Sequence, residues 1–220
     1  MKLLFSALIA VLATTLHPAT HAQGITGDVA AGEKKNAMCI GCHGIEGYQA
    51  SFPEVHKVPM IAGQNAAYIA AALTAYKKGD RKHPTMRGIA DTLSEQDIAD
   101  LSAYYAAQGG AAAETPAKPA KAPGPQIAEL LKKGNCAACH GENFNQPIDP
   151  SYPKLAGQHT DYLYVALKAY KDNPNAVVGR NNAIMGAQVK PYSLDELDAL
   201  AEYIGSLPTE LKTVSQPKFR

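Results

Sequence analysis

The sequence predicts an all-α protein built from two similar tandem domains, and three observations support this prediction. A short cysteine and histidine motif occurs twice, near the start of each half of the 220-residue chain. Apolar residues recur with helical spacing, and no window alternates apolar and polar residues as a strand would. A segment rich in Ala, Pro and Lys separates the two copies. The length therefore divides into two domains of about 90 residues each.

The repeated motif is CIGCH at 39–43 and CAACH at 136–140. The pattern Cys-x-x-Cys-His attaches a c-type haem through two thioethers, and its histidine then becomes the proximal ligand of the iron. Two copies predict two covalently bound haem c groups. The predicted attachment residues and proximal ligands are Cys39, Cys42 and His43 in the first half and Cys136, Cys139 and His140 in the second.

A lone Cys-x-x-Cys also fits a dithiol redox pair or half of a zinc site. A zinc ribbon needs its cysteine pairs roughly 15 to 20 residues apart, and a thioredoxin-like site needs a βαβ pattern around it. Neither condition is met here. Both copies carry the histidine, and together they use all four cysteines of the chain, so haem attachment is the favoured interpretation.

The first element is a predicted signal peptide over residues 1–22. Met1-Lys2 precedes the apolar run 3–13, and the small-residue end Thr20-His21-Ala22 is typical of a cleavage site. The apolar run is shorter than the roughly 20 residues that a membrane span needs. An uncleaved anchor is the alternative. Export agrees with haem attachment, which takes place outside the bacterial cytoplasm.

Three helices are predicted in the first domain, residues 23–110. Asp28 is a plausible N-cap for a helix that runs to Met38. A second helix opens near Asn65 and ends at Gly79, and a third begins with the capping-box pattern of 94–97. Their predicted buried residues are Ile69, Ala72, Leu73, Tyr76, Ile98, Leu101 and Tyr105.

Residues 111–125, AAAETPAKPAKAPGP, are the predicted linker. This composition has nothing to pack and favours polyproline II, so the segment is expected to be extended and semi-rigid. It can span up to about 45 Å at roughly 3.1 Å per residue. The second domain is then residues 126–220.

The second domain repeats the first with small loop differences. Pro-Met-Ile-Ala-Gly-Gln at 59–64 matches Pro-Lys-Leu-Ala-Gly-Gln at 153–158, and a capping-box pattern at 193–196 again precedes a terminal helix. Further matches join Tyr68, Leu73, Tyr76 and Lys77 to Tyr162, Leu167, Tyr170 and Lys171. The apolar face of the terminal helix is predicted to hold Leu197, Leu200 and Ile204.

The charge balance argues against an anionic partner. Lys and Arg number 21 and Asp and Glu number 20, and no glycine loop of a phosphate-binding type is present. We therefore expect no nucleic-acid partner and no stable membrane insertion. Domains this small bury a modest core, so the fold should depend on haem for much of its apolar interior.

Met86 and Met185 are the predicted distal ligands of the two irons. A thioether in the sixth position favours the ferrous state and raises the potential. Each methionine precedes a capped terminal helix and lies well after the haem motif. The alternative is that each merely fills the core. His83 is a weaker candidate ligand, because the matching residue in the second half is Asn182.

Pro59 and Pro153 each open a Pro-x-[Ile/Leu]-x-Gly turn. A metal-bound histidine normally donates its free ring N–H to a nearby acceptor, which fixes its orientation. Because proline has a carbonyl but no N–H, these residues are predicted to accept from His43 and His140. An ordinary loop proline is the alternative.

Arg81 and Arg180 also match between the two halves. Arginine favours charge-assisted contacts with carboxylates, so both are candidate partners of haem propionates. Solvated surface charges are an equally good interpretation of these two positions.

The order of motifs resembles a known family. Cys-x-x-Cys-His, then Pro-x-[Ile/Leu]-x-Gly, then a methionine before a C-terminal helix is the order of a class I cytochrome c. Two such units behind a signal peptide, with Ala-Gly-Gln after the proline in both, are similar to the dihaem cytochromes c4 of bacterial respiratory chains. The resemblance covers essentially the whole mature chain.

The resemblance implies two class I cytochrome c domains related by a pseudo-two-fold axis, with their haems facing each other through the propionate edges. It also implies electron delivery from the cytochrome bc1 complex, or an equivalent donor, to a terminal oxidase. One departure concerns the glycine that lets the first and last helices of such a domain cross closely. Gly32 can serve in the first domain, but Glu129 takes its place in the second.

The sequence therefore predicts a periplasmic electron carrier that binds no substrate at iron. Its partners would be redox proteins that dock weakly, namely the bc1 complex, a terminal oxidase or small periplasmic redox proteins. Different surroundings, such as Tyr48 and His56 against Phe144 and Asp149, permit two unequal potentials. The alternatives are a dihaem peroxidase or thiosulfate-oxidising cytochrome, and the electron-entry subunit of a sulfide-oxidising flavocytochrome.

Overall fold

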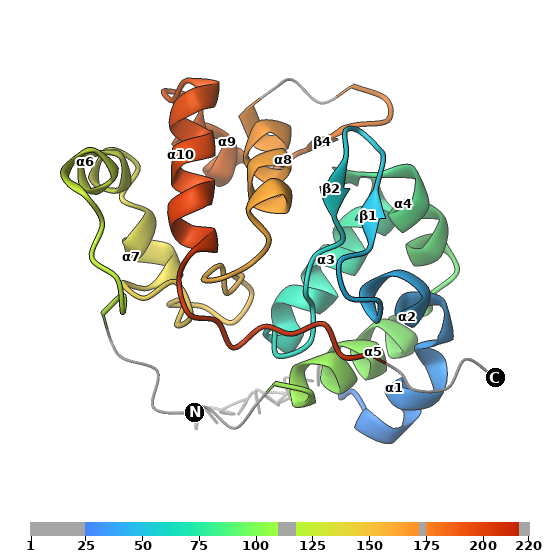
Figure 1. Cartoon of the computed structure of the whole chain (residues 1–220). Coiled ribbons are helices and arrows are strands. Elements are labelled where there is room, and N and C mark those ends of the chain that lie inside the picture. The colour runs from blue at the N-terminus through green and yellow to red at the C-terminus, as the bar shows by residue number, and fades with distance from the viewer. Residues whose placement is uncertain (1–24, 110–117, 172–174, 216–220) are drawn as a thin grey trace, which may run out of the picture.

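The structure, a computed structural model, describes residues 25–109, 118–171 and 175–215. It has two helical domains, which lie side by side in Figure 1. The helices of the first are α1 (Val29–Lys35), α2 (Ala37–His43), α3 (Ala66–Lys78), α4 (Pro84–Asp91) and α5 (Glu95–Ala107). Those of the second are α6 (Pro125–Lys133), α7 (Cys136–His140), α8 (Thr160–Lys171), α9 (Ala183–Val189) and α10 (Leu194–Gly205).

Three of the predicted helices are confirmed with their caps. Asn65 is the N-cap of α3, and Gly79 ends that helix in the left-handed conformation with φ of 81°. Ser94 and Ser193 close complete capping boxes at the starts of α5 and α10. The side chains predicted to be buried on α5 and α10 are buried.

The first predicted helix is shorter than expected. The side chain of Asp28 accepts from the Ala31 N–H and starts α1, but the helix ends at Lys35 rather than at Met38. The chain turns at Asn36, which is buried and begins α2. The first haem motif therefore lies in a helix of its own.

Very short strands accompany the helices of this all-α fold, although no sequence window predicts one. Four strands of two residues each occur among the described residues: β1 (Gln49–Ala50), β2 (His56–Lys57), β3 (Arg81–Lys82) and β4 (Gly179–Arg180). Strands this short have no alternation from which a sequence pattern could predict them. β1 pairs with β2 in the first domain, whereas β3 of the first domain pairs with β4 of the second.

The β3–β4 pair places equivalent residues of the two domains opposite each other. The strands are antiparallel, and Arg81 is the register partner of Arg180. A two-fold axis that passes between two antiparallel strands places each residue opposite its equivalent in the other strand, as Arg81 and Arg180 are here. The predicted pseudo-two-fold relation between the domains is therefore visible in this pairing.

The two domains pack their first and last helices differently. In the first domain, a Cβ added at Gly32 of α1 would lie 2.2 Å from the backbone oxygen of Asp100 in α5, so only glycine permits this approach. In the second domain, the side chain of Leu130 on α6 packs against Leu197 and Leu200 of α10 and fills the space between the two helices. Glu129, the residue matched to Gly32, is exposed.

The described segment that follows α10 returns to the first domain. After α10 the tail runs beneath both domains toward α5 (Figure 1). The Lys212 N–H donates to the carbonyl of Ala62 at 3.0 Å, and Val214 packs against the core of the first domain.

The predicted signal peptide at 1–22 and residues 111–117 of the predicted linker lie outside the described residues. The described end of the linker, 118–124, contains neither helix nor strand, and α6 begins at Pro125, one residue before the predicted start of the second domain. No described helix is long and apolar enough to cross a membrane.

Candidate haem sites

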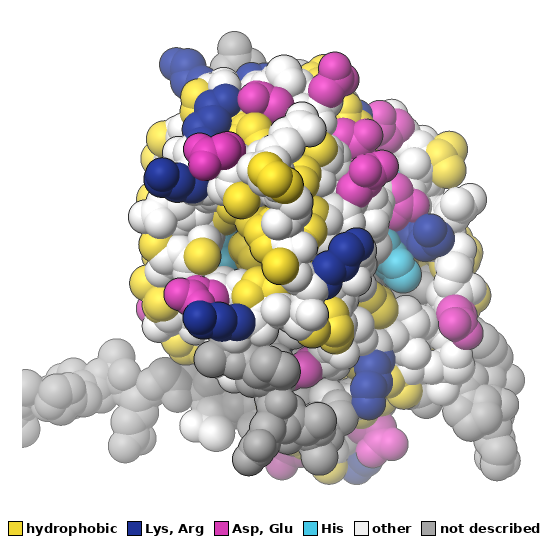
Figure 2. Space-filling view, turned by 60° about the vertical axis from the view of Figure 1, so that its left-hand side comes forward, with side chains coloured by type: hydrophobic (Ala, Val, Ile, Leu, Met, Phe, Trp, Pro, Cys, Tyr) yellow, Lys and Arg dark blue, Asp and Glu magenta, His cyan; other side chains and the backbone are white. Residues whose placement is uncertain are grey.

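A cavity of about 710 Å³ is lined by residues of both domains. On the face turned forward in Figure 2, hydrophobic side chains gather near the centre and charged side chains lie around them. The cavity lining contains all the residues predicted to hold haem iron or to attach haem: Cys39, Cys42, His43, Met86, Cys136, Cys139, His140 and Met185.

All four cysteines are unpaired. Cys39 and Cys42 are three residues apart within α2 and therefore lie on neighbouring positions of one helix face, and Cys136 and Cys139 repeat this spacing in α7. Burial raises the pKa of the Cys39 and Cys136 thiols. All four thiols are therefore free at the cavity wall.

Each motif histidine is oriented by a proline carbonyl. Nδ1 of His43 lies 2.9 Å from the oxygen of Pro59, and Nδ1 of His140 lies 3.2 Å from the oxygen of Pro153. Because a carbonyl can only accept, Nδ1 carries the proton and Nε2 keeps the lone pair that could bind a metal. Burial lowers the pKa of both imidazoles, against the opposing effect of these carbonyls, which favours the neutral, ligating form.

Met86 and Met185 occupy equivalent positions near the starts of α4 and α9. The Met86 N–H donates to Nδ1 of His83 at 3.4 Å, and the Met185 N–H donates to Oδ1 of Asn182 at 2.9 Å. Each methionine is thus held by an N-capping side chain three residues earlier.

Both ring nitrogens of His83 are engaged. Nδ1 accepts from the Met86 N–H, and Nε2 lies 3.2 Å from the carbonyl of Phe52, to which it donates. This arrangement requires the neutral ring, and burial lowers the pKa of His83. No nitrogen lone pair of His83 remains for a metal, which argues against His83 as the distal ligand of the first iron.

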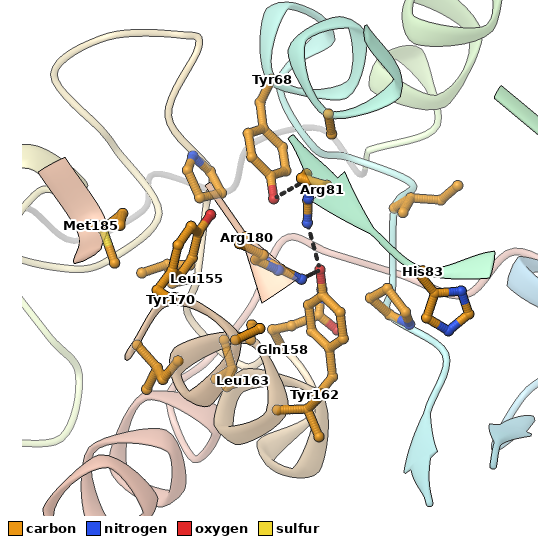
Figure 3. Close-up of a pocket in the computed structure, with 18 of the residues that line it drawn as sticks. Tyr68, Arg81, His83, Leu155, Gln158, Tyr162, Leu163, Tyr170, Arg180 and Met185 are labelled. Atoms are coloured by element: carbon orange, nitrogen blue, oxygen red, sulfur yellow. Dashed lines mark hydrogen bonds between the residues drawn. The ribbon is translucent and has the colours of Figure 1, made fainter. Parts of the chain in front are cut away.

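Arg81 and Arg180 lie at the boundary between the domains, within a cluster of tyrosines (Figure 3). Arg81 donates to the hydroxyls of Tyr68 and Tyr162, each at 3.3 Å, and Arg180 donates to Tyr162 at 3.0 Å. Burial alone would raise the pKa of the Tyr162 hydroxyl, but Arg180 and Arg81 outweigh it and lower that pKa. The cluster is therefore strongly electropositive.

The residues present fit two haem c groups. Arg81 is 8% exposed, and its Nε has no hydrogen-bond partner in the described part of the chain. Within the same part of the chain, neither arginine forms an ion pair with an Asp or Glu. A buried positive charge is best balanced by an anion, and haem propionates on the cavity side would add this to the tyrosine hydroxyls that both arginines already bind.

Sequence reasoning missed two further pairs at this boundary. The first pair is Tyr68 and Tyr162. The sequence shows that they match, but not that their hydroxyls accept hydrogen bonds from the arginines. Gln64 and Gln158, which end the repeated Ala-Gly-Gln, are 4% exposed each and bond across the boundary. The signal for both pairs was their identity in the two halves.

The two-domain helical fold and its paired Cys-x-x-Cys-His sites define the molecule as a dihaem c-type cytochrome. The family model described as "Cytochrome c" matches the chain twice, at residues 29–107 and 125–208. The cytochrome c4 of Pseudomonas aeruginosa is 32% identical over 211 residues, which cover 94% of this chain and 98% of that protein. The chain belongs to the dihaem cytochrome c4 family.

Two other similarities bear on function. The crystal structure of reduced recombinant cytochrome c4 from Pseudomonas stutzeri matches with a TM-score of 0.62 and 28% identity, and the match covers 83% of this chain and all of that one (100%). A protein named "Thiosulfate dehydrogenase electron acceptor" from Stutzerimonas stutzeri is 30% identical over 178 residues, which cover 77% of this chain and 78% of that protein. The chain is therefore an electron-transfer cytochrome with two covalently bound haem c groups.

Proposed function

We propose that this cytochrome is a periplasmic electron carrier that links the bc1 complex, or an equivalent donor, to a terminal oxidase. Haem c supplies reversible exchange of one electron between ferrous and ferric iron. The protein would hold each group by two thioethers, at Cys39 and Cys42 in one domain and at Cys136 and Cys139 in the other. The axial positions would be filled by His43 with Met86 and by His140 with Met185.

The observation that carries the proposal is the presence of a methionine at the equivalent place in both halves of the cavity. A carrier needs an iron without an open coordination site, whereas a peroxidase or another haem enzyme needs one. The carbonyls of Pro59 and Pro153 would hold the axial histidines in one tautomer and one orientation, which limits rearrangement when the iron changes charge.

Arg81 and Arg180 are proposed partners of the propionates. Their position at the boundary would bring the propionate edges of the two haems toward the same electropositive cluster. Positive charge that is fixed near both groups favours the reduced state, because reduction adds a negative charge. The cluster would therefore raise both potentials.

The test is the visible spectrum of the dithionite-reduced holoprotein with and without carbon monoxide, with haem per chain measured on the same sample. Two haems per chain and no response to carbon monoxide are expected. Met86→Ala and Met185→Ala should each open one iron to carbon monoxide and lower its potential, while Met38→Leu, at an exposed methionine, should open neither. A carbon monoxide response in the unmodified protein would contradict the carrier and favour a dihaem enzyme.

A second candidate function keeps the chemistry and changes the donor. The similarity to the electron acceptor of a thiosulfate dehydrogenase favours a carrier that receives electrons from thiosulfate oxidation. Rapid reduction of the purified protein by thiosulfate with a thiosulfate dehydrogenase, but not by thiosulfate alone, would support this donor. Reduction by a bc1 complex and not by the dehydrogenase would exclude it.

A further inference from the structure

Gln64 and Gln158 form a reciprocal exchange between the domains. Each follows the repeated Ala-Gly and is almost fully buried. Oε1 of Gln64 accepts from the Lys154 N–H at 2.9 Å, and its Nε2 donates to the Lys154 carbonyl at 3.0 Å. Gln64 therefore binds the backbone of the second domain through both the oxygen and the nitrogen of its side-chain amide.

The second half of the exchange has the same pattern. Oε1 of Gln158 accepts from the Met60 N–H at 3.0 Å, and its Nε2 donates to the Met60 carbonyl at 2.8 Å. Gln158 lies close to Tyr162 of the arginine and tyrosine cluster (Figure 3). The two glutamines thus lie at the boundary where the two haem sites meet.

The residues that the glutamines bind are the ones that follow the two prolines. The Met60 N–H and the Pro59 carbonyl belong to one peptide group, and so do the Lys154 N–H and the Pro153 carbonyl. A peptide group is planar and trans, so its N–H and C=O point in opposite directions. An acceptor that fixes the N–H therefore also fixes the direction of the carbonyl.

Each of these carbonyls accepts from a motif histidine. A continuous chain of hydrogen bonds thus runs from Gln158 through the Pro59–Met60 peptide to Nδ1 of His43, and an equivalent chain runs from Gln64 to His140. Hydrogen bonds in series polarise one another. A glutamine in one domain can therefore affect the basicity of a histidine in the other.

We infer that Gln64 and Gln158 are crossed positioning residues, each of which orients and tunes the axial histidine of the opposite domain. The inference rests on the proposed function, because His43 and His140 must be the iron ligands for the chain of bonds to reach iron. It predicts that the potential of each haem depends on a side chain that its own domain does not contain.

Each loop is also held by one further side chain of the opposite domain. In the first domain, the Lys57 N–H, two residues before Pro59, donates to Oδ2 of Asp161 at 3.0 Å. In the second, the Tyr152 carbonyl, directly before Pro153, accepts from Nδ2 of Asn65 at 3.2 Å. Asn65→Ala should produce a weaker form of the Gln64 effect, again at the haem of the second domain.

The test is Gln64→Met and Gln158→Met in the holoprotein, with the potential of each haem followed separately by NMR during a redox titration. The Met86 and Met185 variants assign the paramagnetic signals to their domains. Methionine preserves the volume of glutamine and removes the amide. A looser carbonyl makes the histidine less basic, so Gln64→Met should raise the potential of the second haem and Gln158→Met that of the first.

The shifts must be crossed for the inference to hold. A shift at the haem of the substituted domain, equal shifts at both haems, or no shift at either would overturn it. If a methionine variant fails to fold, Gln64→Asn and Gln158→Asn shorten the side chain by one methylene and provide the same comparison. An unmodified protein whose irons lack histidine ligation would contradict the proposed function instead, before any variant is compared.

Discussion

The first and second domains share a haem motif but close their terminal helices in different ways. In the first, Gly32 lets the backbones of α1 and α5 meet, and Lys35 pairs with Asp97 at 2.7 Å and Asp100 at 2.6 Å. In the second, apolar side chains separate α6 from α10, and the Tyr192 hydroxyl donates to the Leu130 carbonyl at 2.6 Å. The close glycine contact is therefore one solution to this packing and not a requirement of the domain.

The largest difference between the domains is expected at the glycine. Gly32→Val would place side-chain atoms into the backbone of α5, and a Cβ there would already lie 2.6 Å from Cβ of Tyr104. Overpacking of this kind costs about 3 kcal/mol. Amide hydrogen exchange in α1 and α5 of the holoprotein should accelerate accordingly. The matched variant is Glu129→Val, at an exposed position. It should change the free energy of opening that hydrogen exchange reports for α6 and α10 by less than about 0.5 kcal/mol.

The caps of the methionine helices offer the next comparison. Asn182→Ala removes a well-formed N-cap from α9 and should destabilise the helix by about 1 kcal/mol. His83→Ala should loosen the first turn of α4 less, because the cap contact to the Met86 N–H is longer, at 3.4 Å, and the other bond of His83, to the Phe52 carbonyl, lies outside the helix. Exchange of the first amides of α4 and α9 measures both effects. Equal losses in the two helices would show that the two caps contribute alike.

The hydroxyl of Tyr192 gives a test of the second domain alone. Tyr192→Phe removes one buried hydrogen bond to α6 and keeps the ring in place, so a loss of about 1 kcal/mol is expected. Hydrogen exchange in α6 should report it. Leu93 matches Tyr192 in the first domain, and exchange in α1 should not change in this variant.

The ion pairs should have the smallest and most pH-dependent effects. Lys35 is the main cause that lowers the pKa of Asp97 and Asp100. A lowered carboxylate pKa contributes stability above its ordinary value, and this stability is lost as the pH falls through the lowered one. Lys35→Met should therefore destabilise α1 and α5 at neutral pH, and its difference from the unmodified protein should shrink below about pH 4.

Lys133→Met is the counterpart in the second domain. The pKa of Glu196 is lowered first by the backbone N–H of Ser193 and only then by Lys133, so the larger cause remains in this variant. The neutral-pH loss should be smaller than for Lys35→Met, as measured by exchange in α6 and α10. A larger loss would mean that the second domain also depends on its ion pair.

Features that depend on nearby residues could be predicted from the sequence. The caps at Asn65, Ser94 and Ser193 and the buried faces of α5 and α10 follow from patterns within one or two helical turns. On α3, Ile69 is buried, whereas the other predicted residues, Ala72, Leu73 and Tyr76, are half-buried at the cavity. The cysteines, histidines and methionines that the repeated motifs single out all line the cavity, which Met38, Met60, His56 and His83 line as well. The ligand roles assigned to the motif residues remain predictions.

Features that depend on contact between the domains could not be predicted. The register of Arg81 against Arg180 arises from two strands of two residues, which leave no periodic pattern. The contacts of Gln64 and Gln158 join residues 90 and 98 positions apart. Their repetition in both halves indicated that they matter, but not which backbone groups they bind. Likewise, the sequence did not indicate that Asn36 divides the first predicted helix.

The returning tail means that the chain crosses between the domains twice. One crossing is the linker, and the other is the segment that follows α10, where Lys212 pairs with Ala62 and Val214 enters the first core. Proteolysis within the linker would therefore yield two fragments that stay associated, because the tail adds main-chain and apolar contacts to the domain boundary. Independent expression of residues 23–110 and 126–220 should likewise permit fragment complementation, with the tail as the part whose removal weakens it.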